Sequence, residues 1–135
     1  MNHTEKSLWK IFSKFIRFRD ADERGYCHCI SCNKIDNWKK LDAGHYIPKG
    51  SDMALKFNEI NVNAQCSSCN VYKSGNIIEY RIGLIKKYGE KIVKKLELSH
   101  QFKTTHKKLN QLEINELWKY YSKKVKELEK IKSYD

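Results

Sequence analysis

The stretch DAGHYIPKGSDMALKFNEINVNAQCSSCNVYKSGN, residues 42–76, decides how the rest of the chain is arranged. It begins within a short apolar run, residues 41–47, which predicts a β-strand carrying His45. Because side chains alternate between the two faces of a strand, Asp42 and Gly44 lie on one face and His45 lies on the other. Taken alone, such a histidine is more often a buried, hydrogen-bonded core residue than a catalytic one.

The residues after this strand predict a loop, a second extended segment and a helix. Pro48 and the polar run 49–52 end the strand, because proline and glycine favour turns. An extended segment is expected over 57–64, and a helix is expected to begin with the cysteine-bearing run 66–73. The break at 74–76 then separates this helix from the next. The centre of the fold is therefore predicted to be two short strands followed by a helix.

Four cysteines fall into two pairs with the same spacing, Cys29 with Cys32 and Cys66 with Cys69. Two residues between cysteines give a tight turn with both sulfurs facing one point, and two such pairs are typical of tetrahedral Zn²⁺ sites. Buried thiols without a metal are the alternative, whereas a thioredoxin-like motif lacks the surrounding βαβ pattern. Cys27 is left over. The sequence predicts a structural zinc, Zn²⁺, held by four thiolates.

Length and composition indicate one basic domain, residues 1–135. The chain has 27 Lys and Arg against 16 Asp and Glu, a formal net charge of +11. An excess of this size favours a polyanionic partner, most often nucleic acid, although a merely lysine-rich surface gives the same count. No apolar run reaches the ~20 residues that span a bilayer, and no secretory signal opens the chain. We therefore expect no membrane partner and a cytoplasmic protein with reduced cysteines.

An amphipathic helix is predicted at the beginning of the chain, over 4–19. Its apolar and aromatic side chains follow a helical stripe, which we assign to the core rather than to base stacking. The acidic run 20–25 ends this helix with glycine. The single domain is thus expected to comprise the helix 4–19, a core over 26–88 and basic helices over 90–132.

The C-terminal half is predicted to be helical. Helices are expected over 77–88 and 90–98, followed by a polar connector that exposes His100 and His106. The last helix, 111–131, has an apolar stripe of nearly heptad spacing and a coat of lysines. Such a helix packs on the core, forms a dimer seam or lies along DNA, and the stripe is too short to assert a coiled coil.

Three polar residues are interleaved with the cysteine pairs in a recognisable order. His45 stands in GHYIP, and Asn61 and Asn70 stand in NVNAQCSSCNVYKSGN. This order resembles that of the HNH nucleases, which have the ββα-metal fold. The resemblance implies a mostly helical α+β protein in which a ββα-metal core with a four-cysteine zinc knuckle is flanked by the N-terminal and C-terminal helices.

A narrower resemblance covers roughly residues 5–130. The motifs CISC, DAGHY, FNE, QCxxCNxxKSGN and YR, with the final lysine-rich helix, are similar to those of the phage lambda NinG (Rap) recombination endonuclease family. This resemblance implies an HNH-type DNA endonuclease that acts on Holliday junctions and D-loops during phage recombination. It also implies a phage or prophage protein in the cytoplasm of a bacterial host.

The resemblance also implies roles for particular residues. In HNH enzymes the first histidine is the general base, which is His45 here, and an imidazole with a pKa near 6.5 suits that role at neutral pH. Asn70 matches a ligand of a hard catalytic cation, Mg²⁺ or Mn²⁺. Asn61 is expected to orient His45 or to brace the loop. Many HNH sites have a metal-binding aspartate where this chain has Gly44, and Asp42 is our candidate replacement.

Four basic residues are candidate DNA contacts, namely Lys49, Lys56, Lys73 and Arg81, although each could be ordinary solvated surface. A zinc-ribbon DNA-binding module without hydrolytic activity is the main alternative, because the cysteines and the charge serve it equally well. A sequence-specific homing or restriction-type HNH enzyme fits less well, because no separate reading segment is evident. Symmetric cutting of a four-way junction favours a two-fold homodimer.

Overall fold

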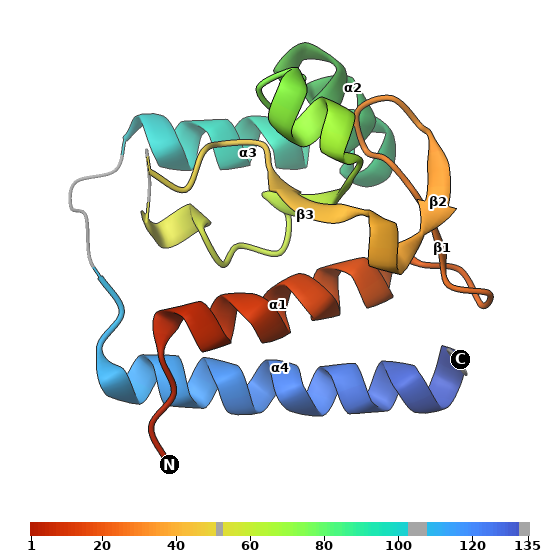
Figure 1. Cartoon of the computed structure of the whole chain (residues 1–135). Coiled ribbons are helices and arrows are strands. Elements are labelled where there is room, and N and C mark those ends of the chain that lie inside the picture. Colours follow the sequence, from red (N-terminus) through yellow and green to blue (C-terminus); the bar gives the residue numbers. More distant parts are fainter. Residues whose placement is uncertain (51–52, 103–107, 133–135) are drawn as a thin grey trace.

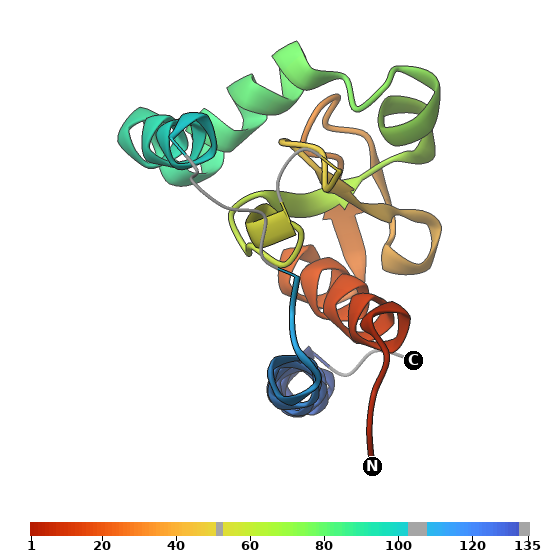
Figure 2. The ribbon, with the colours of Figure 1, turned by 90° about the vertical axis from the view of Figure 1, so that its left-hand side faces the viewer.

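The computed structural model describes residues 1–50, 53–102 and 108–132. It is a mostly helical α+β structure with two separate two-stranded antiparallel sheets. Figure 1 shows α1 and α4 side by side along one side of the molecule, with β3 next to α1 and with α2 and α3 beyond it, and Figure 2 shows the same order. In chain order the elements are α1 (Glu5–Asp20), β1 (Tyr26–His28), β2 (Ile35–Asn37), the short turn η1 (Trp38–Lys40), β3 (Asp42–His45), η2 (Met53–Leu55), β4 (Val62–Gln65), the π-helical turn η3 (Ser68–Tyr72), α2 (Ile77–Tyr88), α3 (Glu90–Gln101) and α4 (Gln111–Lys132).

Helix α1 confirms the predicted N-terminal helix and forms the centre of the largest apolar cluster. Thr4 caps it, because its side-chain oxygen accepts a hydrogen bond from the Ser7 amide at 2.9 Å. Full burial of one large apolar side chain contributes about 1.5–3 kcal/mol, so the apolar face of this helix is a main source of stability. The buried side chains on that face are Leu8, Phe12, Phe15, Ile16 and Phe18.

Helix α4 packs on α1, which confirms the first of the three arrangements expected from its sequence. Tyr121 and Val125 are buried in the same cluster as the apolar face of α1. Near the other end of α4, the Lys132 ammonium donates to the backbone oxygens of Phe18 and Ala21, at 2.7 and 2.8 Å. These carbonyls lie at the end of α1, where a cation satisfies groups that have no partner within the helix.

Strands β3 and β4 pair antiparallel, with Asp42 opposite Gln65 and His45 opposite Val62. One face of this hairpin packs on α1 through Ala43 and Val62, and the opposite face carries buried polar side chains. The extended segment predicted over 57–64 is wrong in its first half, because regular pairing begins only at residue 62. The helix predicted over 66–73 is only the five-residue turn η3, and the β1–β2 hairpin was not predicted.

A buried charge cluster joins the end of α1 to β4 and α2. The Asp20 carboxylate accepts hydrogen bonds from Arg19 and Lys87, each at 2.8 Å, and from the Ala64 amide at 2.9 Å. Burial alone would raise the pKa of Asp20, but the two cations lower it below its usual value. Arg19 also donates to the backbone oxygen of Val62 at 3.0 Å. The hairpin is therefore held in place by ionic contacts as well as by apolar packing.

The two helices after the hairpin lie close to their predicted positions. Helix α2 has the predicted bounds, and Gly89, with a φ of 91°, ends it in a conformation that favours glycine. Helix α3 extends three residues beyond the predicted 90–98, so His100 is half-buried in its last turn rather than exposed in a connector. The rest of that predicted connector, including His106, lies outside the described residues. Among the described helices, none is long and apolar enough to cross a membrane.

Candidate metal centre and hydrolytic site

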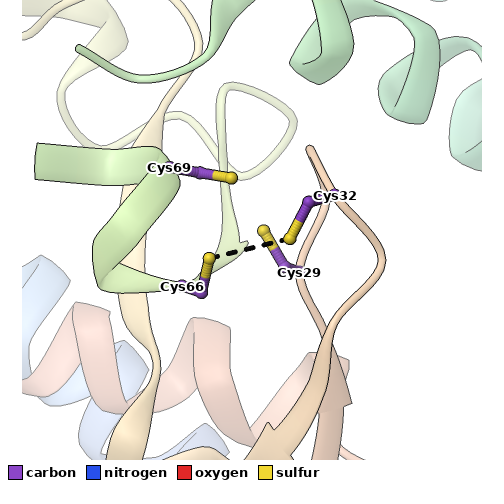
Figure 3. A group of neighbouring side chains, drawn as sticks. All are labelled: Cys29, Cys32, Cys66 and Cys69. Carbon is purple, nitrogen blue, oxygen red and sulfur yellow. Dashed lines mark hydrogen bonds between the residues drawn. The ribbon is translucent and has the colours of Figure 1, made fainter. Parts of the chain in front are cut away.

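The two predicted cysteine pairs converge on one point. The four sulfur atoms of Cys29, Cys32, Cys66 and Cys69 all lie within 4.8 Å of one another. Figure 3 shows the sulfurs facing a common centre, and those of Cys32 and Cys66 are 3.7 Å apart. Tetrahedral bonds of about 2.3 Å from Zn²⁺ to sulfur place neighbouring sulfurs about 3.8 Å apart, so the spacing fits zinc. The cluster is therefore consistent with a structural zinc.

Each cysteine pair sits on a backbone turn that local hydrogen bonds define. The first pair occupies the turn between β1 and β2, where the Asn33 amide donates to the Cys29 oxygen at 2.9 Å. The second pair begins η3, where the Asn70 amide donates to the Cys66 oxygen at 2.9 Å. The Ile30 amide donates to the Ala64 oxygen and so joins the first turn directly to β4. The metal centre thus connects the two hairpins.

Cys27 lies outside this cluster. Its thiol is fully buried and donates to the Arg17 backbone oxygen at 3.3 Å. Burial raises the pKa of Cys27 to about 12, and its sulfur is not among those that converge on the common centre. Cys27 is therefore a core residue.

Asp42 and Asn70 meet at the beginning of β3. The Asn70 amide nitrogen donates to Asp42 Oδ2 at 3.1 Å, which joins the first residue of β3 to η3. Because a carboxylate only accepts hydrogen bonds, the amide nitrogen faces Asp42 and the amide oxygen remains for another partner. Two oxygen donors of the kind that hard cations prefer are thus adjacent. Within the described residues, the pair does not belong to a larger group of three or more carboxylate, imidazole or thiolate ligands.

His45 lies at the other end of β3, and a hydrogen bond determines its tautomer. Its Nε2 is 3.0 Å from the Lys56 backbone oxygen, which can only accept, so the proton of the neutral ring is on Nε2. Nδ1 then carries the lone pair. Burial, with smaller contributions from Lys49 and Lys56, lowers the pKa of His45 below its usual value. The ring is therefore neutral at pH 7, as a general base must be.

Asn61 holds the loop rather than the histidine. Its side chain is fully buried, and its amide nitrogen donates to the backbone oxygens of Ile47 and Leu55 at 2.9 and 3.0 Å. Its side-chain oxygen accepts from the Ile47 amide at 2.8 Å. These bonds join both ends of the loop that follows β3. Of the two expected roles, the contacts correspond to bracing the loop.

The position before His45 has no room for a side chain. A Cβ atom built on Gly44 would lie 1.9 Å from Gln65 Oε1 and 2.9 Å from Gln65 Cδ. Gln65 is fully buried, and its amide nitrogen donates to Ser31 Oγ and to the Gly75 oxygen at 2.9 and 2.7 Å. An aspartate at position 44 would displace this side chain. The chain therefore cannot carry the usual HNH aspartate there without rearranging its core.

The four basic residues expected to bind DNA have different surroundings. Lys56 forms an ion pair with Glu5 at 3.0 Å, and Arg81 forms a two-bond pair with Glu97 at 2.8 and 3.1 Å. Lys49 and Lys73 are exposed, and the Lys49 ammonium lies 6.0 Å from the centre of the Trp9 ring. Two of the four are thus paired with carboxylates, and Lys49 and Lys56 both lie near His45.

Two residues near the candidate site residues His45 and Asp42 were not predicted from the sequence. The Trp9 ring stacks on the His45 ring, with 5.0 Å between the ring centres and 21° between the planes. Arg17 donates to the backbone oxygens of Ser13 and Trp38, at 3.2 and 3.3 Å. Trp9 lies three residues before Phe12, so the helical spacing indicated that its ring would face the core, where it stacks on His45. Nothing in the sequence pointed to the second.

Together, the fold and the side chains define a mostly helical α+β protein with a cluster of four cysteines suited to a metal ion. A family model described as "Bacteriophage Lambda NinG protein" matches residues 1–132. The chain therefore belongs to the NinG family.

Curated relatives support this assignment. "Protein ninG" of Escherichia phage lambda is 39% identical over 95 residues, which cover 70% of this chain and 44% of that protein. "Protein ninG" of Salmonella phage P22 is 38% identical over 96 residues, which cover 71% of this chain and 45% of that protein. The chain thus spans less than half the length of the curated relatives it matches. No solved structure matches the chain.

Proposed function

We propose that the chain is an HNH-type, metal-dependent DNA endonuclease that hydrolyses phosphodiester bonds in branched DNA. The observation that carries the proposal is the arrangement of three side chains along β3. Asp42 and Asn70 are hydrogen-bonded at its beginning, and His45 has a defined tautomer and a lowered pKa at its end. The antiparallel β3–β4 hairpin supplies the two strands expected of a ββα-metal core, and the short turn η3 stands where that core has its helix.

His45 is the general base in this proposal. Its Nδ1 takes a proton from a water molecule, and the water oxygen attacks phosphorus as the bond to the 3′-oxygen breaks. The products are a 5′-phosphate and a 3′-hydroxyl, with one proton delivered to the leaving oxygen. The hydrogen bond from Nε2 to the Lys56 oxygen and the stacked Trp9 ring hold the imidazole in place during this step.

Asp42 and Asn70 hold the catalytic cation in this proposal. Mg²⁺ or Mn²⁺ bound there would stabilise the charge that develops on the leaving oxygen. Such ions commonly use one or two protein oxygens, with water and substrate phosphate as the other ligands, so a two-residue site is sufficient. Asp42 and His45 are separated by about 10 Å of strand and point to opposite faces of it, so the strand end would have to shift for both to reach one scissile phosphate.

The preference for branched DNA is part of the same proposal and rests on membership of the NinG family. Resolving a four-way junction requires two cuts related by symmetry, so we propose that two copies act on one junction. The net charge of +11 supports attraction to DNA without distinguishing branched from linear forms.

The test compares His45→Ala and Asn70→Ala with His28→Ala, because His28 is exposed on β1 and serves as a matched control. General-base catalysis contributes about 10²–10⁴-fold, so His45→Ala should reduce the cleavage rate by that factor and leave DNA affinity nearly unchanged. His28→Ala should cut at the wild-type rate. A parallel loss of affinity and cleavage in His45→Ala would refute the base assignment. Binding without cutting by every variant and by the wild type would instead favour a non-catalytic zinc-ribbon module.

A further inference from the structure

One side of α1 forms an open groove whose lining is basic and hydroxylated. We call this surface the α1 groove. Its lining includes Lys6, Ser7, Trp9, Lys10, Ser13 and Arg17. No acidic side chain from the described residues lines it. This combination of cations and hydroxyl groups is suited to phosphate oxygens.

The α1 groove runs beside the proposed hydrolytic site. At one end, the Trp9 ring stacks on His45. At the other end, burial lowers the pKa of Arg17, while the nearby Asp42 carboxylate acts in the opposite direction. Helix α1 therefore accompanies β3 from His45 back to Asp42. The eight helical steps from Trp9 to Arg17 cover about 12 Å of helix.

Arg17 is held in a way that leaves part of its guanidinium group for a ligand. Its Nε and Nη1 atoms donate to backbone oxygens of Ser13 and Trp38, and its guanidinium carbon lies 5.2 Å from the centre of the Trp38 ring. No carboxylate in the described chain forms an ion pair with it. A guanidinium carries five N–H donors in a planar fork, so donors remain after these contacts. Such a pre-ordered, half-buried cation is suited to a phosphate group.

We propose that the α1 groove binds the backbone of one DNA strand next to the cut, with Arg17 on the phosphate nearest the Asp42–Asn70 pair. The proposal rests on the endonuclease function proposed above and extends it by naming the surface that holds the substrate. A strand that advances about 3.4 Å per nucleotide places three or four nucleotides along this segment of about 12 Å. Lys10 contacts a phosphate farther along the strand, and the exposed edge of Trp9 contacts a sugar or a base.

The openness of the groove argues for a polymer rather than a small ligand. It is lined by one helix and is not enclosed, whereas small-molecule sites bury most of their ligand. A nucleotide alone would have contacts on one side only, whereas a DNA strand is also held by the rest of the protein.

The test is the salt dependence of DNA affinity, measured by fluorescence anisotropy with a labelled four-way junction. The zinc-loaded protein is used without added Mg²⁺, so that binding is measured without cleavage. Lys10→Gln and Arg17→Gln are compared with Lys95→Gln, which removes the same charge from the exposed side of α3, away from α1 (Figure 1). Each lost phosphate contact should reduce the slope of log affinity against log salt by about 1. Lys95→Gln should keep the wild-type slope.

The outcomes separate this inference from the proposed function. If Lys10→Gln keeps the wild-type salt slope, as Lys95→Gln should, DNA does not bind in the α1 groove. Because Lys10 is exposed, its replacement should not unfold the protein and so does not confuse this result. A wild-type slope in Arg17→Gln, in a variant whose thermal unfolding is cooperative, would overturn the placement of Arg17. If the wild type does not cut DNA at all but the salt slope is smaller in both groove variants, the endonuclease proposal fails and DNA binding in the α1 groove is retained.

Discussion

Replacing Gly44 by alanine should destabilise the protein far more than a single methyl group usually does. The backbone of Gly44 is not in the left-handed region, so alanine is compatible with its conformation. The added Cβ would nevertheless lie 1.9 Å from Gln65 Oε1 and 3.1 Å from Gln65 Cβ. The Gln65 side chain must therefore move, although it is fully buried among its neighbours.

The size of this destabilisation follows from the interactions that the Gln65 side chain loses. Its two hydrogen bonds, to Ser31 Oγ and to the Gly75 oxygen, contribute about 1 kcal/mol each. Leaving their buried partners unsatisfied and overpacking the site costs about 1–3 kcal/mol more. Gly44→Ala should therefore reduce the free energy of unfolding by about 3–5 kcal/mol. Gln65→Ala alone should cost about 3 kcal/mol, because it removes the same two bonds and leaves a cavity.

A double-mutant cycle tests this reasoning by urea denaturation of the zinc-loaded protein. Once Gln65 is alanine, the clash with Oε1 and Cδ is gone and only the tight 3.1 Å contact with the Cβ at position 65 remains, so Gly44→Ala should add about 1 kcal/mol or less in that background. The expected coupling free energy is about 3 kcal/mol. Additive losses in the double variant would refute the proposed steric conflict, as would a single Gly44→Ala variant with wild-type stability.

Three further predictions concern the metal centre, the base and the loop. Removing zinc with a chelator, or replacing Cys66 by serine, should unfold both hairpins and break contacts between them such as the hydrogen bond from Ile30 to Ala64. Circular dichroism and amide exchange would detect this loss, and an unchanged spectrum after zinc removal would contradict the structural role of the metal. Because burial lowers the pKa of His45, the cleavage rate should rise with pH to a plateau, and the midpoint of this rise should lie below pH 6.5. A midpoint above about pH 7 in the pH–rate profile would contradict the assignment. Asn61→Ala removes three buried hydrogen bonds and should cost about 3 kcal/mol in urea unfolding, with loss of cleavage, whereas a stable and active variant would show that the loop does not need this brace.

The parts of the fold that could be predicted from the sequence are those that local patterns determine. The N-terminal helix follows from a stripe of apolar residues with helical spacing. The four-cysteine cluster follows from paired spacing, because a CxxC turn orients two sulfurs locally. The last helix was predicted within one residue of its end. Each of these features needs only a short segment of chain to specify it.

The parts that could not be predicted depend on residues that are far apart in the chain. Strands of three or four residues, such as Tyr26–His28, are too short for alternation to be distinguished from irregular structure. Arg81 and Lys56 looked like free cations because Glu97 and Glu5, their partners, are 16 and 51 residues away. The resemblance to HNH nucleases gave the Asp42–Asn70 pair as a hypothesis, and tertiary folding was needed to place the two side chains in contact.

The most direct test of the endonuclease proposal is the cleavage of a labelled four-way junction beside a linear duplex of matched sequence. Zinc-loaded protein would be incubated with each substrate, with and without Mg²⁺, and His45→Ala would be run in parallel. We expect Mg²⁺-dependent cutting of the junction that is lost in the variant. Equal cutting of both substrates would remove the preference for branches and keep the nuclease. Tight binding with no cutting under Mg²⁺ or Mn²⁺ would contradict the endonuclease proposal and identify a DNA-binding module instead.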